Sequence, residues 1–298
     1  MKEKNSIFIT GSSGFVGRNL IDFLSIKFDF VLFDKKNFSI DGCETVLHLA
    51  GEAHDLKNVL NPSNYYINNT DLTIKIFNEF LASSAKVFIT LSSVKAVVDY
   101  IDGELDENFL SNPSTHYGIS KKLAEDFILS QDVPFDKRVY ILRPSMIHGK
   151  GNKGNLNLLY QFASTGIPWP LGSFENHRSF CSIDNLLFVV AELVSRVDVP
   201  SGVYNICDDV PLSTNQIVSM ISQSVGKPIL IWKIPKRIIF LVAKIGDFFK
   251  LGINSERLTK LTQNFIVSNN KIKTVLGKEL PIDSSTGMRN TINSFKVL

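Results

Sequence analysis

Short apolar runs alternate with longer amphipathic segments through the first half of the chain. The apolar runs predict buried strands over residues 6–10, 30–33, 45–49, 87–91 and 139–142. Between them, apolar side chains at helical spacing predict helices over residues 15–26, 64–82 and 117–129. Strands that are apolar on both faces and alternate with helices are typical of a parallel sheet covered by helices on both sides. The pattern therefore predicts an α/β fold with a doubly wound parallel sheet.

This pattern changes after about residue 144, where glycine, asparagine and proline become frequent. Beyond Gly172, amphipathic segments predict helices over residues 184–196, 213–225 and 235–250, and a short strand over 230–232. We therefore expect a sheet domain over residues 1–144, rejoined by parts of 180–206. A smaller, mostly helical domain over residues 145–298 is expected to fold over the edge of the sheet.

The segment over residues 235–250 has two interpretations. Its apolar side chains recur at helical spacing, as at Ile238, Leu241 and Ile245, and such a stripe could face a membrane or a partner. A stripe of this kind usually faces the core, so we expect a core-facing helix. Lys244 and Asp247 interrupt the segment, which is shorter than the ~20 residues of a membrane span.

Composition excludes several classes of protein. The chain has 298 residues, of which 44% are hydrophobic and 20% charged, as in an ordinary globular protein. These values argue against a disordered, collagen-like or coiled-coil chain. The net charge of +3 is too small to indicate a nucleic-acid partner, and it suits an anionic small molecule equally well.

The cysteines and the N-terminus point to the cytoplasm. Cys43, Cys181 and Cys207 lie far apart and show no zinc-binding or CxxC spacing, so we expect neither a metal site nor a disulfide framework. The first residues lead into the first strand with no apolar leader segment. The sequence thus predicts a cytoplasmic protein without a signal peptide or an integral membrane segment.

A glycine-rich loop joins the first predicted strand to its helix. Gly11 permits a tight turn, Gly14 lets the backbone approach a pyrophosphate, and Gly17 lets the helix pack closely on the strand. Asp34 follows at the end of the second predicted strand, where a carboxylate can bind both ribose hydroxyls of a dinucleotide. It would repel a 2′-phosphate, which favours NAD over NADP, although two lysines follow it. The alternative is an ordinary strand-to-helix turn.

A second glycine-rich segment, GKGNKG over residues 149–154, fits the GxGxxG spacing literally. It follows the fifth predicted strand, but no acidic residue ends a strand at the required distance beyond it. We interpret it as a loop on the substrate side that faces a second phosphate-bearing group. A flexible surface loop is an equally good interpretation.

Tyr117 and Lys121 stand four residues apart and therefore share one face of a predicted helix. An ammonium group near a phenol favours the phenolate and lowers the tyrosine pKa, which suits a general acid/base at neutral pH. Ser92 and Ser93 close the fourth predicted strand at the sheet edge where ligands bind. A serine hydroxyl there can hold the oxygen that Tyr117 deprotonates, or it can simply bond the backbone at a strand end.

In this order, the motifs resemble the extended short-chain dehydrogenase/reductase family, and most of all its nucleotide-sugar epimerases and dehydratases. The resemblance covers nearly the whole chain. It rests on GSSGFVG at 11–17, Asp34, HLAG at 48–51, Ser92 and Ser93, YGISK at 117–121, LRP at 142–144, HRSF at 177–180 and SIDNL at 182–186.

This resemblance implies a role for each matching residue. Ser93, Tyr117 and Lys121 would form the catalytic trio. The residues expected to bind NAD are Gly11, Gly14, Phe15, Val16, Gly17, Asp34, Leu49, Ala50, Gly51, Asn69, Tyr117 and Lys121. Asn68 is the rival of Asn69 if the register slips by one. Ser93, Asn155 and Arg178 would bind the substrate, the last two at its diphosphate, although Arg178 could instead make a surface ion pair.

The implied activity is that of an NAD-dependent nucleotide-sugar 4-epimerase, acting on a UDP-hexose or UDP-N-acetylhexosamine through a transient 4-keto sugar. Ser93 leads into Val94, Lys95 and Ala96, a departure that resembles bacterial surface-polysaccharide enzymes, and the absence of an acid pair beside it disfavours dehydration. The alternatives are an NAD(P)H-dependent reductase of a 4-keto-6-deoxy nucleotide sugar and a non-catalytic NAD-binding regulator. The resemblance also implies a homodimer.

Overall fold

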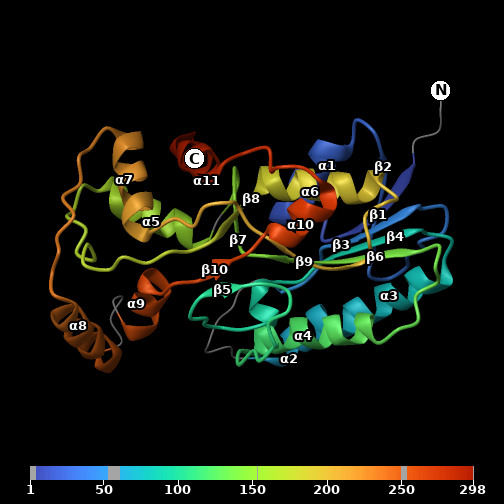
Figure 1. The fold of residues 1–298 in the computed structure, drawn as a ribbon, viewed down its shortest axis with the longest axis horizontal. Helices are drawn as coiled ribbons and strands as arrows, with labels where there is room; N and C mark the ends of the chain where they lie inside the picture. Colours follow the sequence, from blue (N-terminus) through green and yellow to red (C-terminus); the bar gives the residue numbers. More distant parts are fainter. Residues whose placement is uncertain (1–4, 53–60, 153, 250–253, 298) are drawn as a thin grey trace.

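A six-stranded parallel sheet forms the centre of the molecule in this computed structural model, which describes residues 5–52, 61–152, 154–249 and 254–297 (Figure 1). The strand order is β2-β1-β3-β4-β6-β9. The bounds are β1 Ser6–Thr10, β2 Asp29–Leu32, β3 Thr45–His48, β4 Val87–Leu91, β6 Arg138–Pro144 and β9 Gly202–Ile206. All pairings are parallel, which confirms the predicted α/β class.

Helices cover both faces of this sheet, because successive strand residues point to opposite sides. Ile7 and Ile9 of β1 pack in one apolar cluster, and Phe8 packs in another. Figure 1 shows α1 (Phe15–Leu24), α6 (Ile183–Ser195) and α10 (Asn270–Leu276) on one face, and α3 (Leu72–Ala82) and α4 (His116–Leu129) on the other. The chain returns to the sheet through β9, and the two-domain division stays a prediction.

The sheet has its topological switch point at β1, which pairs with β2 on one side and with β3 on the other. The chain reaches β3 through residues 33–44, a connection without helix in which Phe33 and Phe38 pack against Phe8. Connections that leave β1 and β3 in opposite directions open a crevice at the carboxyl ends of these strands. This crevice is the expected ligand site.

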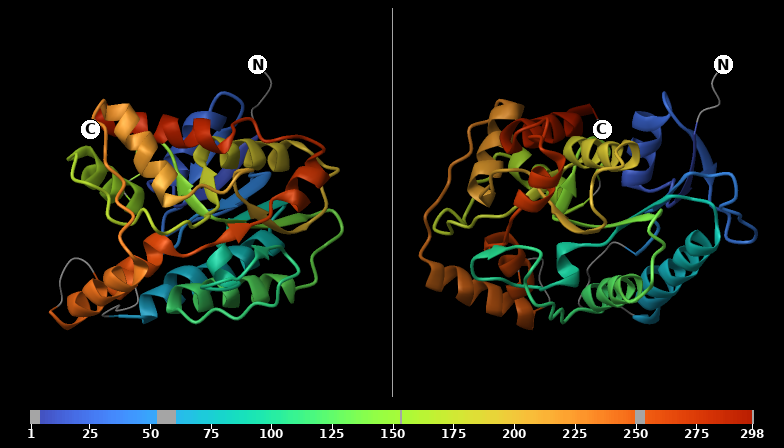
Figure 2. Two further views of the ribbon diagram at one scale, coloured as in Figure 1. Left: turned by 60° about the vertical axis from the view of Figure 1, so that its left-hand side comes forward. Right: turned by 45° about the vertical axis from the view of Figure 1, so that its right-hand side comes forward.

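A further apolar cluster lies beyond the sheet, where α5 (Asn155–Ser164), α7 (Thr214–Val225) and α11 (Ser284–Ser294) meet (Figure 2). Two short parallel ladders connect this region to the rest of the chain. One pairs β7 (Met146–His148) with β8 (Phe180–Ser182), and the other pairs β5 (Glu104–Leu105) with β10 (Ile266–Val267). The strand predicted over 230–232 appears as an isolated bridge between Ile231 and Trp169.

The helix predicted over residues 64–82 is divided into three parts. These are α2 (Ser63–Tyr65), the π-helix η1 (Tyr66–Asp71) and α3. The remaining helices are η2 (Val94–Ala96), α8 (Lys236–Phe248), α9 (Ser255–Thr262) and η3 (Phe295–Val297). No helix in the described ranges is long and apolar enough to cross a membrane.

The apolar stripe of α8 expected to face the core does not face it, so that expectation is wrong for the residues on which it rested. Ile239, Ala243 and Gly246 are its buried residues, whereas Leu241 is 60% exposed and Ile245 is 47% exposed. Helical spacing shows that apolar side chains share a face, but it does not show that the rest of the chain covers that face.

Candidate active site

The glycine-rich loop lies where β1 meets α1. Gly11 has φ +70°, and a β-carbon on it would lie 2.7 Å from the backbone nitrogen of Ala50, which follows β3. A β-carbon on Gly17 would overlap the Gly11 carbonyl oxygen. Gly14 donates its N–H to Gly11 O at 3.0 Å and is the N-cap of α1. Side chains are thus excluded at Gly11 and Gly17, and the start of the glycine-rich loop lies directly against the residues that follow β3.

Two groups at this edge of the sheet suit a dinucleotide. Phe15 and Val16 are the first residues of α1, and the first amides of a helix have no carbonyl partner within the helix. Phe33 N donates to Ile9 O at 3.0 Å, so Asp34 follows it beside the end of β1. The exposed Asp34 carboxylate accepts the Lys36 N–H at 3.0 Å.

Buried hydrogen bonds hold the backbone of Leu49 and Ala50. Both N–H groups donate to the hydroxyl oxygen of Thr10, at 3.1 and 3.0 Å. That hydroxyl lies 2.8 Å from Nδ1 of His48. The end of β3 is therefore tied to the end of β1 through one side chain.

His48 continues the chain of bonds towards η1. Its Nε2 lies 2.9 Å from Thr73 Oγ1, and Thr73 donates its hydroxyl proton to Asn69 O at 2.7 Å. Because the hydroxyl proton of Thr73 is already donated to Asn69, Nε2 of His48 donates to Thr73 and Nδ1 accepts from Thr10. Burial, together with the charge of Lys121, lowers the pKa of His48 to about 3. His48 is therefore a neutral connector at neutral pH.

Asn69 links three segments around the crevice. Its Oδ1 accepts the Glu52 N–H at 2.7 Å, and its Nδ2 donates to Glu52 O and to Ser120 Oγ, at 3.2 and 3.0 Å. A β-carbon on Gly51 would lie 2.6 Å from Asn69 Oδ1 and 3.0 Å from Lys121 Nζ. Asn69 is fully buried, and these contacts favour it over its neighbour Asn68.

Ser93, Tyr117 and Lys121 are all buried at the carboxyl edge of the sheet. Ser93 is the N-cap of η2 and accepts the Lys95 N–H at 3.2 Å. A β-carbon on Gly118 would overlap the Lys95 carbonyl oxygen, so the start of α4 presses against the turn after Ser93. The structure therefore brings the segments that carry the predicted trio together.

Lys121 extends from α4 to the end of β4, where its ammonium donates to Leu91 O at 2.9 Å. Burial lowers its pKa to about 8, against the opposing charge of Glu125 one turn later. Glu125 itself is buried and bonded in a fork to Arg143 of β6, with nitrogen–oxygen distances of 3.0 and 2.5 Å. The Lys121 amine therefore changes its charge at a pH only slightly above neutral.

An acidic side chain that the sequence analysis did not single out positions the start of α4. Asp99 accepts the N–H and hydroxyl of Ser114 at 2.7 and 2.6 Å and contacts Thr115, the N-cap of α4. Burial acts to raise the pKa of Asp99, but the bonds from Ser114 and Thr115 and the charge of Lys95 together outweigh it and hold that pKa below its usual value. An acid followed some 15 residues later by Ser and Thr is too common a pattern to have identified this contact.

The predicted substrate residues lie in other parts of the chain. Asn155 is the first residue of α5, whose N-cap is Gly154. Arg178 donates to the carbonyl of Lys260 in the last turn of α9, and among the described residues it has no carboxylate partner. Neither residue has a hydrogen bond to the trio in the described ranges, so their roles at a diphosphate stay predictions.

The GKGNKG loop is only partly described, because Lys153 lies outside the described residues. A β-carbon on Gly149 would overlap the Ile183 side chain and lie 3.3 Å from the ring of Phe15. The loop therefore starts beside the N-terminus of α1. This position agrees with a loop that faces the ligand crevice.

Comparison with known proteins identifies the family. A model of the NAD dependent epimerase/dehydratase family matches residues 33–207. The chain belongs to this family. The match confirms the resemblance drawn from the motifs, and it makes this protein a member of an NAD-dependent enzyme family.

Two relatives that match most of this chain are named as 4-epimerases of different sugar substrates. A UDP-glucose 4-epimerase of Vibrio cholerae is 28% identical and covers 99% of this chain and 96% of its own. An N-acetyl-alpha-D-glucosaminyl-diphospho-ditrans,octacis-undecaprenol 4-epimerase of Escherichia coli O157:H7 is also 28% identical, over 90% and 85% of the two chains. The solved UDP-glucuronic acid 4-epimerase of Bacillus cereus, in complex with NAD, has a TM-score of 0.74 at 18% identity over 98% and 99%, which shows the fold alone.

NAD is the cofactor of the family, and the crevice fits it. A β-carbon would collide with the backbone at Gly11 and Gly17, the first amides of α1 have no carbonyl partner within the helix, and Asp34 lies beside the end of β1, where it would hold a ribose. The assignment of individual residues to NAD stays a prediction, and Lys121 lies beside Gly51. No group of three or more His, Cys, Asp or Glu in the described ranges could hold a metal ion.

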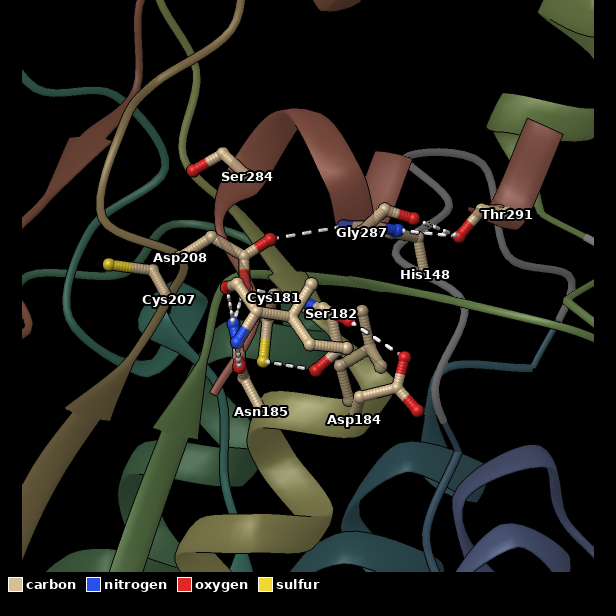
Figure 3. Close-up of polar contacts among 12 residues, drawn as sticks. His148, Cys181, Ser182, Asp184, Asn185, Cys207, Asp208, Ser284, Gly287 and Thr291 are labelled. Carbon is tan, nitrogen blue, oxygen red and sulfur yellow. Dashed lines mark hydrogen bonds and ion pairs between the residues drawn. The ribbon is translucent and has the colours of Figure 1, made fainter. Parts of the chain in front are cut away.

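A buried polar network behind this crevice was not expected from the sequence (Figure 3). His148 at the end of β7 lies 3.2 Å from Asp208 Oδ2 through Nε2 and 2.8 Å from Thr291 Oγ1 through Nδ1. The other oxygen of Asp208 accepts from Ser182 N at 2.9 Å and from Asn185 Nδ2 at 2.7 Å. This network joins β7, α6 and α11. Its member His148 directly precedes the GKGNKG loop.

Proposed function

We propose that this protein is an NAD-dependent 4-epimerase of a nucleotide sugar, of the UDP-hexose or UDP-N-acetylhexosamine type. One observation carries this proposal: the turn after Ser93 packs against the start of α4, and the Lys121 ammonium lies beside Gly51. These groups form an acid/base site at the end of the crevice that fits NAD. The two relatives that match nearly the whole chain, both 4-epimerases by name, support the same reaction.

Tyr117 is the proton carrier in this reaction. Its phenolate oxygen accepts the proton of the sugar C4 hydroxyl, and Ser93 donates a hydrogen bond to the oxygen that becomes a ketone. Lys121, as an ammonium, stabilises the phenolate form of Tyr117. NAD supplies the chemistry of accepting the C4 hydride and returning it to the opposite face of the sugar. Tyr117 then returns its proton to the oxygen, so protons and electrons balance over the cycle.

Removal of the Tyr117 hydroxyl tests this assignment. We expect Tyr117→Phe to lower turnover of UDP-glucose or UDP-N-acetylglucosamine by about 10²- to 10⁴-fold, because general acid/base catalysis contributes about that much. Bound NAD, released and identified by mass, should be retained, and absorbance at 340 nm reports the fraction that is reduced. Tyr204→Phe is the matched control, since that hydroxyl donates to Pro200 at the amino end of β9 and should leave turnover unchanged.

The same measurements separate the alternatives. Protein that purifies without nucleotide and consumes NAD(P)H on a 4-keto-6-deoxy nucleotide sugar would be a reductase. Wild-type protein that binds NAD but converts no sugar would be a regulator. Conversion of a polyprenyl-diphosphate sugar in place of either UDP sugar would retain the epimerase chemistry and contradict the nucleotide carrier.

A further inference from the structure

Helix α8 presents two apolar stripes, and the protein covers one of them. Ile239, Ala243 and Gly246 are buried against the rest of the protein. Beside them lies the outer face of α8, whose side chains are between 46% and 82% exposed. This face consists of Ile238, Leu241, Val242, Ile245, Phe248 and the C-cap residue Phe249.

The outer face is continuous. At about 100° per residue, its six side chains fall within an arc of about 120°, next to the buried stripe. Leu230 and Trp232, in the segment that leads into α8, are also exposed, at 64% and 52%. A monomer rarely exposes a contiguous apolar patch of this kind unless the patch binds something.

Basic side chains border this face. Residues 230–249 contain four basic side chains and one acidic side chain, a net charge of +3. Arg237 and Lys244, seven residues apart, lie along the border of the outer face that faces away from the buried stripe. The one acid, Asp247, accepts the N–H and hydroxyl of Ser255 at 2.9 and 2.5 Å. The surface around the outer face is therefore positive.

The position and the length of α8 suit a partner that offers a flat surface. Figures 1 and 2 show α8 at the end of the molecule remote from β2, with α9 beside it. Its 13 residues are too few to cross a bilayer but enough to lie along one. An apolar helix face, a basic border and an exposed tryptophan are the features of helices that lie in the headgroup region of a membrane.

We propose that the outer face of α8, together with Trp232, docks this protein on a membrane surface that carries anionic lipid. A second copy of the chain is the competing occupant. A twofold axis through this face would bring the basic borders of two copies close together, which is unfavourable, whereas an anionic surface complements them. This inference rests on the exposed face of α8 and does not depend on the sugar substrate.

Tryptophan fluorescence of the full-length protein tests this proposal. The chain has two tryptophans. Trp169 is 4% exposed and Trp232 is 52% exposed, so a change on binding reports on Trp232. With vesicles of phosphatidylcholine and phosphatidylglycerol, we expect a blue shift and quenching by lipids brominated near the headgroup. Trp232→Phe should abolish this change while the protein still sediments with the vesicles.

Two sets of variants separate the apolar from the electrostatic contribution. Leu241→Gln, Ile245→Gln and Phe248→Gln combined should weaken vesicle binding at least tenfold. The matched control combines Ile26→Gln, Phe135→Gln and Val197→Gln, which are 81%, 103% and 81% exposed elsewhere, and should bind as the wild type does. Arg237→Gln with Lys244→Gln should weaken binding to anionic vesicles, as should raised salt.

Either of two results would overturn the proposal. One is wild-type protein that neither sediments with anionic vesicles nor changes its fluorescence. The other is a wild-type dimer that becomes a monomer in the Leu241, Ile245 and Phe248 variant by light scattering, without vesicle binding. Equal thermal unfolding of wild type and variants shows that the substitutions act at the surface. NAD content is unaffected by this test, so the proposed reaction stands or fails separately.

Discussion

At the scale of single residues, His48 shows how a buried side chain positions a ligand-binding backbone. Its two ring nitrogens connect Thr10, which holds the N–H groups of Leu49 and Ala50, to Thr73 and η1. This arrangement needs one acceptor and one donor nitrogen, so it needs the neutral ring. A second proton on the ring is unfavourable, because burial and the charge of Lys121 both disfavour the charged form.

The pH dependence of stability follows from this requirement. The pKa of His48 is about 3 in the folded chain, below the ordinary value of 6.5, so the unfolded chain binds a proton first as pH falls. We expect the His48 contribution to be fully present above pH ~6.5 and to fall by about 2 kcal/mol between pH 7 and pH 5. Urea unfolding of wild type and His48→Gln across this range measures it. Parallel curves for the two proteins would contradict the prediction, and His177→Gln, at an exposed position, is the control.

At the scale of elements, α4 matters because one helix carries Tyr117 and Lys121. Thr115 caps it and accepts the Gly118 N–H at 3.1 Å, while Asp99 from the preceding loop holds Ser114 and Thr115. The same loop begins at Ser93, so one segment sets the distance between the serine and the helix. A shift of α4 would therefore move Tyr117, the proposed base, relative to Ser93.

Substitution of Asp99 tests this view of α4. We expect Asp99→Ala to lower the free energy of unfolding by about 1–2 kcal/mol, because two backbone amides at a helix start lose their acceptor. Turnover should fall about tenfold or more, since small displacements of catalytic groups are costly. Asp106→Ala, which removes a similar local bond to Asn108 N in an exposed turn, is the control. Loss of stability with unchanged turnover would mean that Asp99 only supports the fold.

At the scale of the whole molecule, the Asp208 network joins parts of the chain that are distant in sequence. His148 and Thr291 are 143 residues apart, and Asn185 also donates to Ile282 O at 2.9 Å. Through these bonds, the C-terminal helix α11 is fixed to the start of α6 and to the strand before the GKGNKG loop (Figure 3). The NAD crevice and the region of Asn155 therefore share one buried anchor.

Removal of the Asp208 carboxylate should destabilise the whole fold. We expect Asp208→Ala to lower the free energy of unfolding by about 3 kcal/mol or more, because His148, Asn185 and Ser182 N all lose a buried acceptor. Asp209→Ala is the adjacent control: its partly exposed contacts with Lys273 and with the side-chain amide of Asn269 should contribute about 1 kcal/mol or less each. Equal losses in the two variants, measured by urea unfolding, would refute a special role for Asp208.

Local patterns in the sequence determined the α/β class, the positions of the main strands and helices, and the glycine loop. They did so because strand and helix periodicities repeat within a few residues, and because the motifs at 11–17 and 117–121 each lie within one turn or one helix. The same patterns led to the family, which the match over residues 33–207 confirms. The catalytic and binding roles of individual residues stay predictions.

Tertiary structure alone decided the partners of the buried polar groups and the surroundings of α8. His48 meets Thr73, Asn69 meets Ser120, and His148 meets Asp208 across 25, 51 and 60 residues, which no local pattern encodes. For α8, periodicity shows two apolar stripes but not which of them the rest of the chain covers. Burial depends on what packs against a surface, and packing is a property of the folded chain rather than of any one segment.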